Sequence, residues 1–276
     1  MERKLFCELS PAAYKISTAK CIFLRHVENL LSTVCGERFA SERTEEKFPV
    51  LLYKHSSLIR RRLGNADMRL QENKAVNLSI AAPKISGIVI NPGETFSFWR
   101  LVGEPAEEKG YLEGLTIEGG KPSTGIGGGL CQMTNLIHWM ALHSELDIAE
   151  HHHHDRVDLF PDYGRKVPFG TGTSVLYNYL DYRLKNNTKN TYQLIVYTDG
   201  EYLRGELRAV DRSRYSYHIK TENERFVREV DGVYRRGEVY RAVIDSRTGV
   251  LLKKELIRKN NAKVMYELDE QKISDK

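Results

Sequence analysis

One cysteine of this chain is at a position where it could act as a nucleophile. Cys131 follows three consecutive glycines, Gly127, Gly128 and Gly129, and begins an apolar pattern of helical period that continues to Leu142. The N-terminus of a helix has a partial positive charge and unpaired N–H groups, and both favour a thiolate over a thiol. Cys131 is therefore a candidate nucleophile. The alternative interpretation is a small, buried and inert side chain.

The glycine run and the first turn of this helix also have the composition of a ligand site. Glycine has no Cβ and tolerates positive φ, so the run at 127–129 lets the backbone approach a bound group closely. Helical geometry places Asn135 on the same side as Cys131, away from the apolar stripe. The N–H groups of Cys131 and Gln132, or the Gln132 side-chain amide, could face an anion or a developing oxyanion. We predict that residues 127–129, Gln132 and Asn135 bind a ligand.

Four consecutive histidines, His151 to His154, follow the helix. In a strand, His152 and His154 would share the face of Ile148, and either histidine is a candidate general base. Imidazole is also a common metal ligand, but a consecutive run lacks the i, i+4 spacing of helical zinc motifs. We therefore expect no dedicated metal site and no cofactor.

Asp181 is a carboxylate inside a pattern that otherwise reads as a strand. A carboxylate in such a position needs a partner, and a histidine or Arg183 is the natural one. Cys131, then His152 or His154, then Asp181 is the residue order of papain-like and transglutaminase-like enzymes. The alternative is a structural pair between Asp181 and Arg183.

Charge and cysteine usage exclude several classes of protein. The net charge of +5 comes from basic residues interleaved with 37 acidic ones, so we expect no nucleic-acid partner. The four cysteines show neither a disulfide nor a zinc spacing, which favours a reducing compartment. The N-terminal residues lack a secretory signal, and Lys20, Arg25 and Glu28 interrupt the best apolar window. We therefore expect a cytoplasmic protein without a membrane span.

Hydrophobic periodicity predicts an α+β fold. An amphipathic helix is expected at about 12–34, and a second at about 75–85 despite Pro83. The glycine-led helix should pack on an antiparallel sheet formed by residues 148–154, 173–185 and 191–198, with 173–198 as a hairpin. Residues 1–47 are expected to form the N-terminal helix and a linker, 48–200 the core domain, and 201–276 a β-rich C-terminal extension.

Several unusual motifs occur together between about residue 48 and about residue 200. They are NPGETFSFW, LVG, KGYLEG, GIGGGLCQ, DLFPDYGR, PFGTGT and YNYLDYRLKNNT. In this order they resemble the VanW-like family. The resemblance implies a link to vancomycin resistance and to cell-wall peptide metabolism, but no settled reaction. A family histidine is expected in the 151–154 run, where its register is ambiguous among His152, His153 and His154.

Two hypotheses of different classes follow. The first is a cysteine-dependent hydrolase or acyltransferase that acts on a small peptide or a cell-wall precursor, in a papain-like or transglutaminase-like layout. The second is a non-catalytic ligand-binding or accessory module, in which the glycine loop and the helix N-terminus hold a carboxylate or phosphate. Reactivity of Cys131 at near-neutral pH separates the two.

Overall fold

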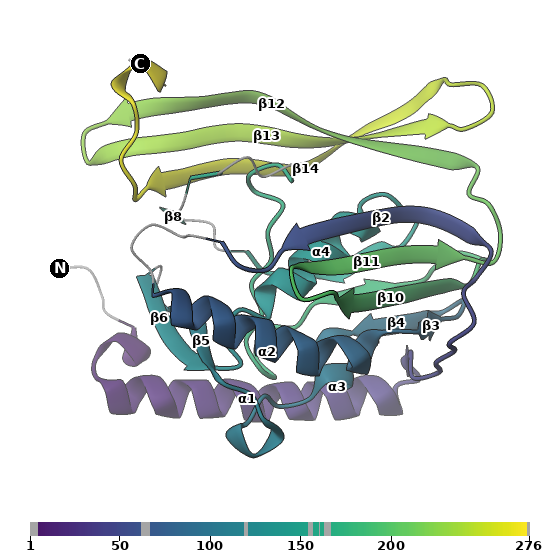
Figure 1. Cartoon of the computed structure of the whole chain (residues 1–276), viewed down its shortest axis with the longest axis horizontal. Helices are drawn as coiled ribbons and strands as arrows, with labels where there is room; N and C mark the ends of the chain where they lie inside the picture. The colour runs from purple at the N-terminus through teal and green to yellow at the C-terminus, as the bar shows by residue number, and fades with distance from the viewer. Residues whose placement is uncertain are drawn as a thin grey trace.

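The computed structural model describes residues 5–61, 67–118, 121–153, 157–159, 161–162 and 167–274. Figure 1 shows a long N-terminal helix along one side, a sheet with helices in the middle, and a ribbon of long strands on the opposite side. The helices are α1 Pro11–Val34, α2 Met68–Ile85, α3 Phe98–Val102 and α4 Cys131–Ala141. Short 3-10 turns lie at η1 Phe6–Glu8, η2 Glu107–Lys109 and η3 Glu270–Lys272.

A four-stranded antiparallel sheet forms the centre. Its strands, in spatial order, are β2 Val50–Leu58, β11 Tyr202–Ala209, β10 Tyr192–Thr198 and β3 Ile88–Ile90. Along β11, Leu203, Leu207 and Ala209 are buried and alternate with half-buried polar positions, as expected for a sheet with one covered face. A Cβ on Gly205 would lie 2.6 Å from Met140 Cε, so α4 rests directly on β11.

Three further assemblies lie around this centre. The first is a sheet of β1 Arg38–Phe39, β4 Glu94–Ser97, β9 Arg183–Lys185 and β7 Asp147–Glu150. The second is the hairpin of β5 Glu113–Glu118 and β6 Lys121–Ile126. The third combines β15 Ile273–Ser274, β12 Tyr215–Glu229, β13 Gly232–Asp245, β14 Leu251–Val264 and β8 Val157–Asp158.

The α+β class and the long N-terminal helix are confirmed. Helix α1 begins at Pro11, capped by the Ser10 hydroxyl, which accepts a hydrogen bond from Ala13 N at 3.1 Å. Helix α2 contains Pro83 in its last turn, where the missing N–H breaks only the end of the hydrogen-bond ladder. No described helix is long and apolar enough to cross a bilayer.

The predicted sheet beneath α4 is wrong in its membership. Strand β10 belongs to the central sheet, whereas β7 and β9 pair in another sheet, so residues 173–198 do not form one hairpin. The chain is redirected at Asn186, whose side-chain amide donates to the carbonyls of Ile90 and Asn190 at 2.9 and 2.8 Å. Upstream, Leu176 and Leu180 form one isolated bridge around Asn178, which has a φ of 43°. The papain-like or transglutaminase-like layout stays a prediction.

Strand β11 begins at Tyr202 and pairs inside the central sheet, while the three longest strands begin at Tyr215. The domain borders predicted at 47/48 and 200/201 stay predictions.

Candidate functional site

The glycine run and α4 are placed as the sequence predicts. Residues 127–130 form a tight turn in which Gly127 and Gly129 have φ values of 75° and 91°. Positive φ is strained for other residue types, so these two positions require glycine. The turn leads directly into α4, where Gln132 N donates to Gly129 O at 3.0 Å.

At Gly128, the backbone of the glycine loop lies directly against the backbone of β5. A Cβ on Gly128 would lie 2.2 Å from the carbonyl carbon of Gly114 on β5. The buried Asn77 of α2 clamps the same place, because its amide donates to Gly128 O at 3.0 Å and to Leu112 O at 2.9 Å. Sequence analysis missed Asn77. Its position could have indicated a structural role, because Asn77 is a polar residue on the core-facing side of a helix, next to Leu78.

The glycine loop and the start of α4 border a large cleft of ≈ 1370 Å³. Strands β2 and β11 form one wall, and β5, the first turns of α2 and residues 167–173 contribute the rest. Gly129, Cys131, Gln132 and Asn135 all line this cleft. Four of the predicted site residues therefore share one cavity.

The charged lining of this cleft is mostly basic. Lys54, Arg60, Arg61, Lys74 and Arg204 line it, and Glu206 is the one acidic lining residue in the part of the chain that the structure describes. Arg60 and Arg204 have carboxylate partners, because Arg60 contacts Glu72 at 2.7 Å and Arg204 contacts Asp199. The carboxylate of Glu206 pairs with the ammonium of Lys47 at 3.0 Å.

Lys74 differs from the other basic residues because it is buried, with 7% of its surface exposed. Its ammonium donates to Gln71 Oε1 at 2.7 Å and pairs with no carboxylate of the described residues. Burial, reinforced by the nearby charges of Arg61 and Arg60, lowers the pKa of Lys74 to about 7. A Cβ on Gly129 would lie 2.3 Å from Lys74 Cγ, so the glycine loop packs on the lysine stem.

Cys131 is half-buried at the first turn of α4. Its Sγ lies 3.9 Å from the carbonyl oxygen of Val175. Burial raises the pKa of the Cys131 thiol, although hydrogen bonding to Val175 acts in the opposite direction. Burial therefore favours the neutral thiol, against the effect expected from the helix N-terminus.

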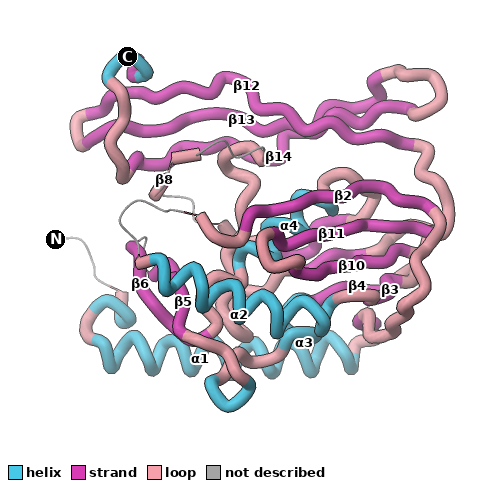
Figure 2. Tube along the Cα trace, in the orientation of Figure 1, coloured by secondary structure: helices cyan, strands magenta, loops and turns pink. Residues whose placement is uncertain are grey.

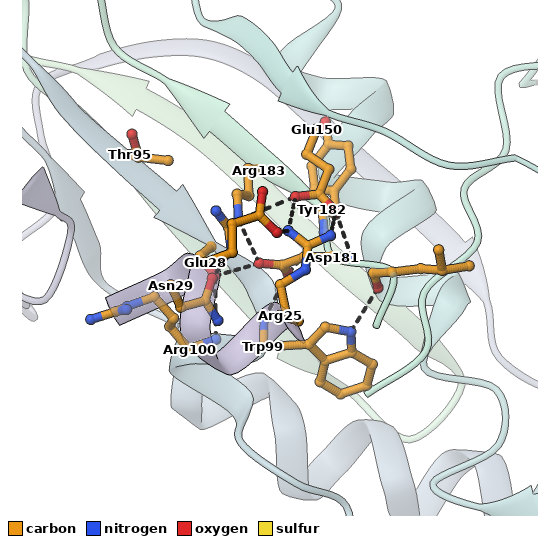
Figure 3. A network of polar contacts seen from close by, with 12 residues as sticks. Arg25, Glu28, Asn29, Thr95, Trp99, Arg100, Glu150, Asp181, Tyr182 and Arg183 are labelled. Carbon is orange, nitrogen blue, oxygen red and sulfur yellow. Dashed lines mark hydrogen bonds and ion pairs between the residues drawn. The ribbon is translucent and has the colours of Figure 1, made fainter. Parts of the chain in front are cut away.

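Asp181 is the centre of a buried hydrogen-bond network (Figure 3). Its carboxylate accepts from Ser97 Oγ at 2.6 Å, Trp99 N at 3.0 Å, Tyr182 N at 2.8 Å and Arg183 Nε at 2.8 Å. A carboxylate can accept about four hydrogen bonds, so these four donors occupy all of its acceptor positions. The structural pair with Arg183, which the sequence offered as the alternative, is present, and none of these partners is Cys131 or a histidine.

His152 forms a hydrogen bond with a second carboxylate, that of Glu150 at the end of β7. Glu150 Oε1 lies 2.7 Å from His152 Nε2 and accepts from Asp181 N at 3.0 Å, while Arg25 of α1 contacts both carboxylate oxygens. Burial works to raise the pKa of Glu150, but hydrogen bonds from His152 and Arg25 outweigh it and hold the pKa at about 2. His152 and Asp181 thus meet at Glu150 and not at Cys131.

The strand alternation expected for the histidines ends early, because β7 stops at Glu150. His151 turns inward, where its ring stacks on His138 at 4.3 Å and its Nε2 lies 2.9 Å from Gly172 O. Burial lowers the pKa of both rings. His154 lies outside the described residues. Within the described ranges no three His, Cys, Asp or Glu side chains group as metal ligands.

Gln132 and Asn135 hold the walls of the cleft together. The Gln132 amide donates to Ser57 Oγ and Leu58 O, both at 2.9 Å, and so ties α4 to β2. Asn135 Oδ1 accepts from Thr173 N at 2.5 Å and from Thr173 Oγ1 at 2.9 Å. The Gln132 N–H that was expected to face an oxyanion already donates to Gly129.

Comparison with known proteins identifies relatives. A family model described as VanW-like protein matches residues 73–208. The vancomycin B-type resistance protein VanW of Enterococcus faecalis (strain ATCC 700802 / V583) is 34% identical over 252 residues, which cover 90% of this chain and 91% of that protein. The uncharacterized protein YoaR of Bacillus subtilis (strain 168) is 31% identical over 115 residues, 42% of this chain and 36% of that protein. No solved structure matches the chain.

Proposed function

The chain belongs to the VanW family, and from this premise we propose that its cleft binds an anionic peptide in a process connected with vancomycin resistance. The proposed ligand is a cell-wall precursor peptide, whose terminal carboxylate supplies the negative charge. The observation that carries this proposal is the buried ammonium of Lys74, which lines the cleft without a carboxylate partner among the described residues.

A buried ammonium without a counter-charge is costly, because the low-dielectric surroundings disfavour its charged form. A ligand carboxylate would supply that counter-charge and restore the charged state. The N-terminus of α4 borders the same cleft and adds a partial positive charge, which also favours an anion. The arrangement therefore supports anion binding better than it supports a permanently activated thiolate.

The size of the cleft supports a peptide over a small metabolite. Small-molecule pockets have volumes of about 300–1,000 Å³, and this cleft reaches ≈ 1370 Å³. Strand β2 is an edge strand of the central sheet, and its second half lines the cleft. An extended peptide could lie along such a strand, with main-chain groups providing affinity.

Binding of a peptide with a free C-terminal carboxylate is expected to weaken as the pH rises through about 7, because Lys74 then loses its proton. Bound carboxylate raises the pKa of Lys74 by linkage, so affinity should fall between that pH and the higher pKa of the complex. Calorimetric titration with a pentapeptide and with its C-terminal amide measures this effect. The amide should bind at least about tenfold more weakly at pH 6.

The matched pair of variants is Lys74→Met and Lys54→Met, since Lys54 also lines the cleft but is exposed. Lys74→Met should remove carboxylate binding and raise the free energy of unfolding by roughly 1–3 kcal/mol, because a desolvated ammonium is lost. Lys54→Met should change both quantities little. Equal binding by the two variants would contradict the role of Lys74.

A second candidate function keeps Cys131 as a nucleophile, because the cysteine lines the same cleft. In that case His152 or His154 takes the thiol proton, Asp181 and Glu150 orient the histidine segment, and the thiolate attacks a peptide carbonyl. The amine leaves with a proton, and water or an acceptor amine then cleaves the thioester. This function requires ligand binding to rearrange the site, since His152 is bonded to Glu150.

Alkylation by iodoacetamide at pH 7 distinguishes the two functions. Cys131 should react far more slowly than the exposed Cys35, because burial raises the pKa of its thiol. Cys131→Ser should retain peptide binding within about twofold, as binding alone does not use the thiolate. Rapid labelling of Cys131 in the presence of the peptide would instead support the cysteine-dependent function.

A further inference from the structure

Helix α1 packs on the core with its polar face. Arg25 and Asn29 point inward, and Arg25 donates to Glu150 Oε2 and Oε1 at 2.8 and 2.6 Å (Figure 3). Asn29 donates to Asn178 Oδ1 at 3.3 Å and accepts from Arg183. An amphipathic helix of a globular protein normally does the reverse and buries its apolar stripe.

The apolar stripe of α1 faces away from the protein. The large side chains of Phe23, Leu30 and Val34 are 66%, 65% and 76% exposed. Others on the same stripe are also exposed: Ile16, Val27 and Leu31. Figures 1 and 2 show α1 running along the outer side of the molecule, so the stripe forms a long apolar surface. Soluble monomers seldom leave such a contiguous surface uncovered.

This orientation is fixed by specific contacts. The side chain of Arg25 is 12% exposed and that of Glu150 is 15% exposed, so their ion pair is largely desolvated. Rotation of α1 that buried the apolar stripe would separate this pair and would leave Arg183 without Asn29. The exposed stripe is therefore not available to cover the core of its own chain.

We propose that α1 binds an anionic lipid surface through its apolar stripe. A helix that lies in the membrane interface has large apolar side chains that enter the lipid and Lys or Arg side chains that reach anionic headgroups. Lys15 and Lys20 are exposed on α1, and the sole acidic residue of the helix, Glu28, lies 3.5 Å from Arg25. The exposed Leu5, Phe6 and Leu9 continue the apolar surface before the helix begins.

Lys20 favours a membrane over a second copy of the chain. It lies within the stripe, one turn after Ile16 and one turn before Phe23 and Leu24. Pairing of two α1 helices would bury its ammonium within the stripe, whereas the one carboxylate of the helix, Glu28, lies at the edge of the stripe and contacts Arg25 at 3.5 Å. At a lipid surface the lysine stem can lie along the acyl chains while the ammonium reaches the anionic headgroups.

Co-sedimentation of the full chain with vesicles tests the proposal. We expect binding to vesicles of equal phosphatidylcholine and phosphatidylglycerol, weaker binding to phosphatidylcholine alone, and release by salt. Leu30→Glu and Phe23→Glu should each reduce binding at least tenfold. Both positions are exposed, so circular dichroism and the thermal midpoint should stay as in the parent protein.

The matched control is Leu252→Glu on β14, where the replaced leucine is 50% exposed but distant in sequence from α1. It should leave vesicle binding within twofold of the parent. The proposal is overturned if Leu30→Glu and Leu252→Glu bind equally, or if no vesicle composition sediments the protein. It is also overturned if sedimentation equilibrium shows a dimer that Leu30→Glu dissociates, since a second copy would then cover the stripe.

Discussion

Gly128→Ala is expected to lower the free energy of unfolding by roughly 3 kcal/mol or more, or to prevent folding. The added Cβ would lie 2.2 Å from the backbone carbonyl carbon and oxygen of Gly114, and backbone cannot move aside as a flexible side chain can. Separation of the two segments would also strain the hydrogen bonds from Asn77 to Gly128 and Leu112. Denaturant unfolding followed by circular dichroism measures the loss.

Gly36→Ala is the control for a general effect of replacing glycine. Gly36 has a φ of 90° with no atom within 4 Å of its added Cβ, so only left-handed strain of about 1–2 kcal/mol is expected. If Gly128→Ala destabilised the protein no more than Gly36→Ala, the close approach of β5 and the glycine loop would not be rigid.

Asp181→Asn is expected to have the second large effect, a loss of roughly 3–5 kcal/mol. The substitution removes the charge that faces Arg183, which is 7% exposed, and replaces an acceptor oxygen with a donor facing Ser97, Trp99 or Tyr182. Thermal unfolding should show the loss whether or not the cleft is occupied. A catalytic role alone would reduce activity without this loss of stability.

Glu72→Gln serves as the comparison, because the ion pair between Glu72 and Arg60 is exposed to solvent. Solvent screens such pairs, and the thermal midpoint should hardly change. An Asp181→Asn protein as stable as Glu72→Gln would show that the buried network does not support the fold.

The sequence was most informative where a pattern is local. The helix at 12–34, the glycine-led helix at Cys131 and the α+β class all follow from periodicity and turn chemistry over short windows. Periodicity alone could not show which side of α1 faces the core. That choice depends on Glu150 and Arg183, which lie more than a hundred residues away in the chain.

The remaining parts of the fold could not be predicted, because they depend on pairing between segments that are distant in the chain. Residues 183–185 and 192–198 both read as strands, but the side chain of Asn186 directs them into different sheets. The basic cleft was missed for a similar reason. Lys74 reads as an ordinary lysine of a surface helix, and only its packing under Gly129 shows that it is buried.

Glu150 joins three parts of the chain through one carboxyl group: α1 through Arg25, the histidine segment through His152, and the backbone at Asp181. Its pKa is about 2 in the folded protein, against an ordinary value of 4.5. The stabilisation that it provides is therefore complete above the ordinary pKa and is lost as the pH falls toward 2. Attachment of α1 and order in the histidine segment consequently depend on the same proton, so an acidic environment would loosen both together.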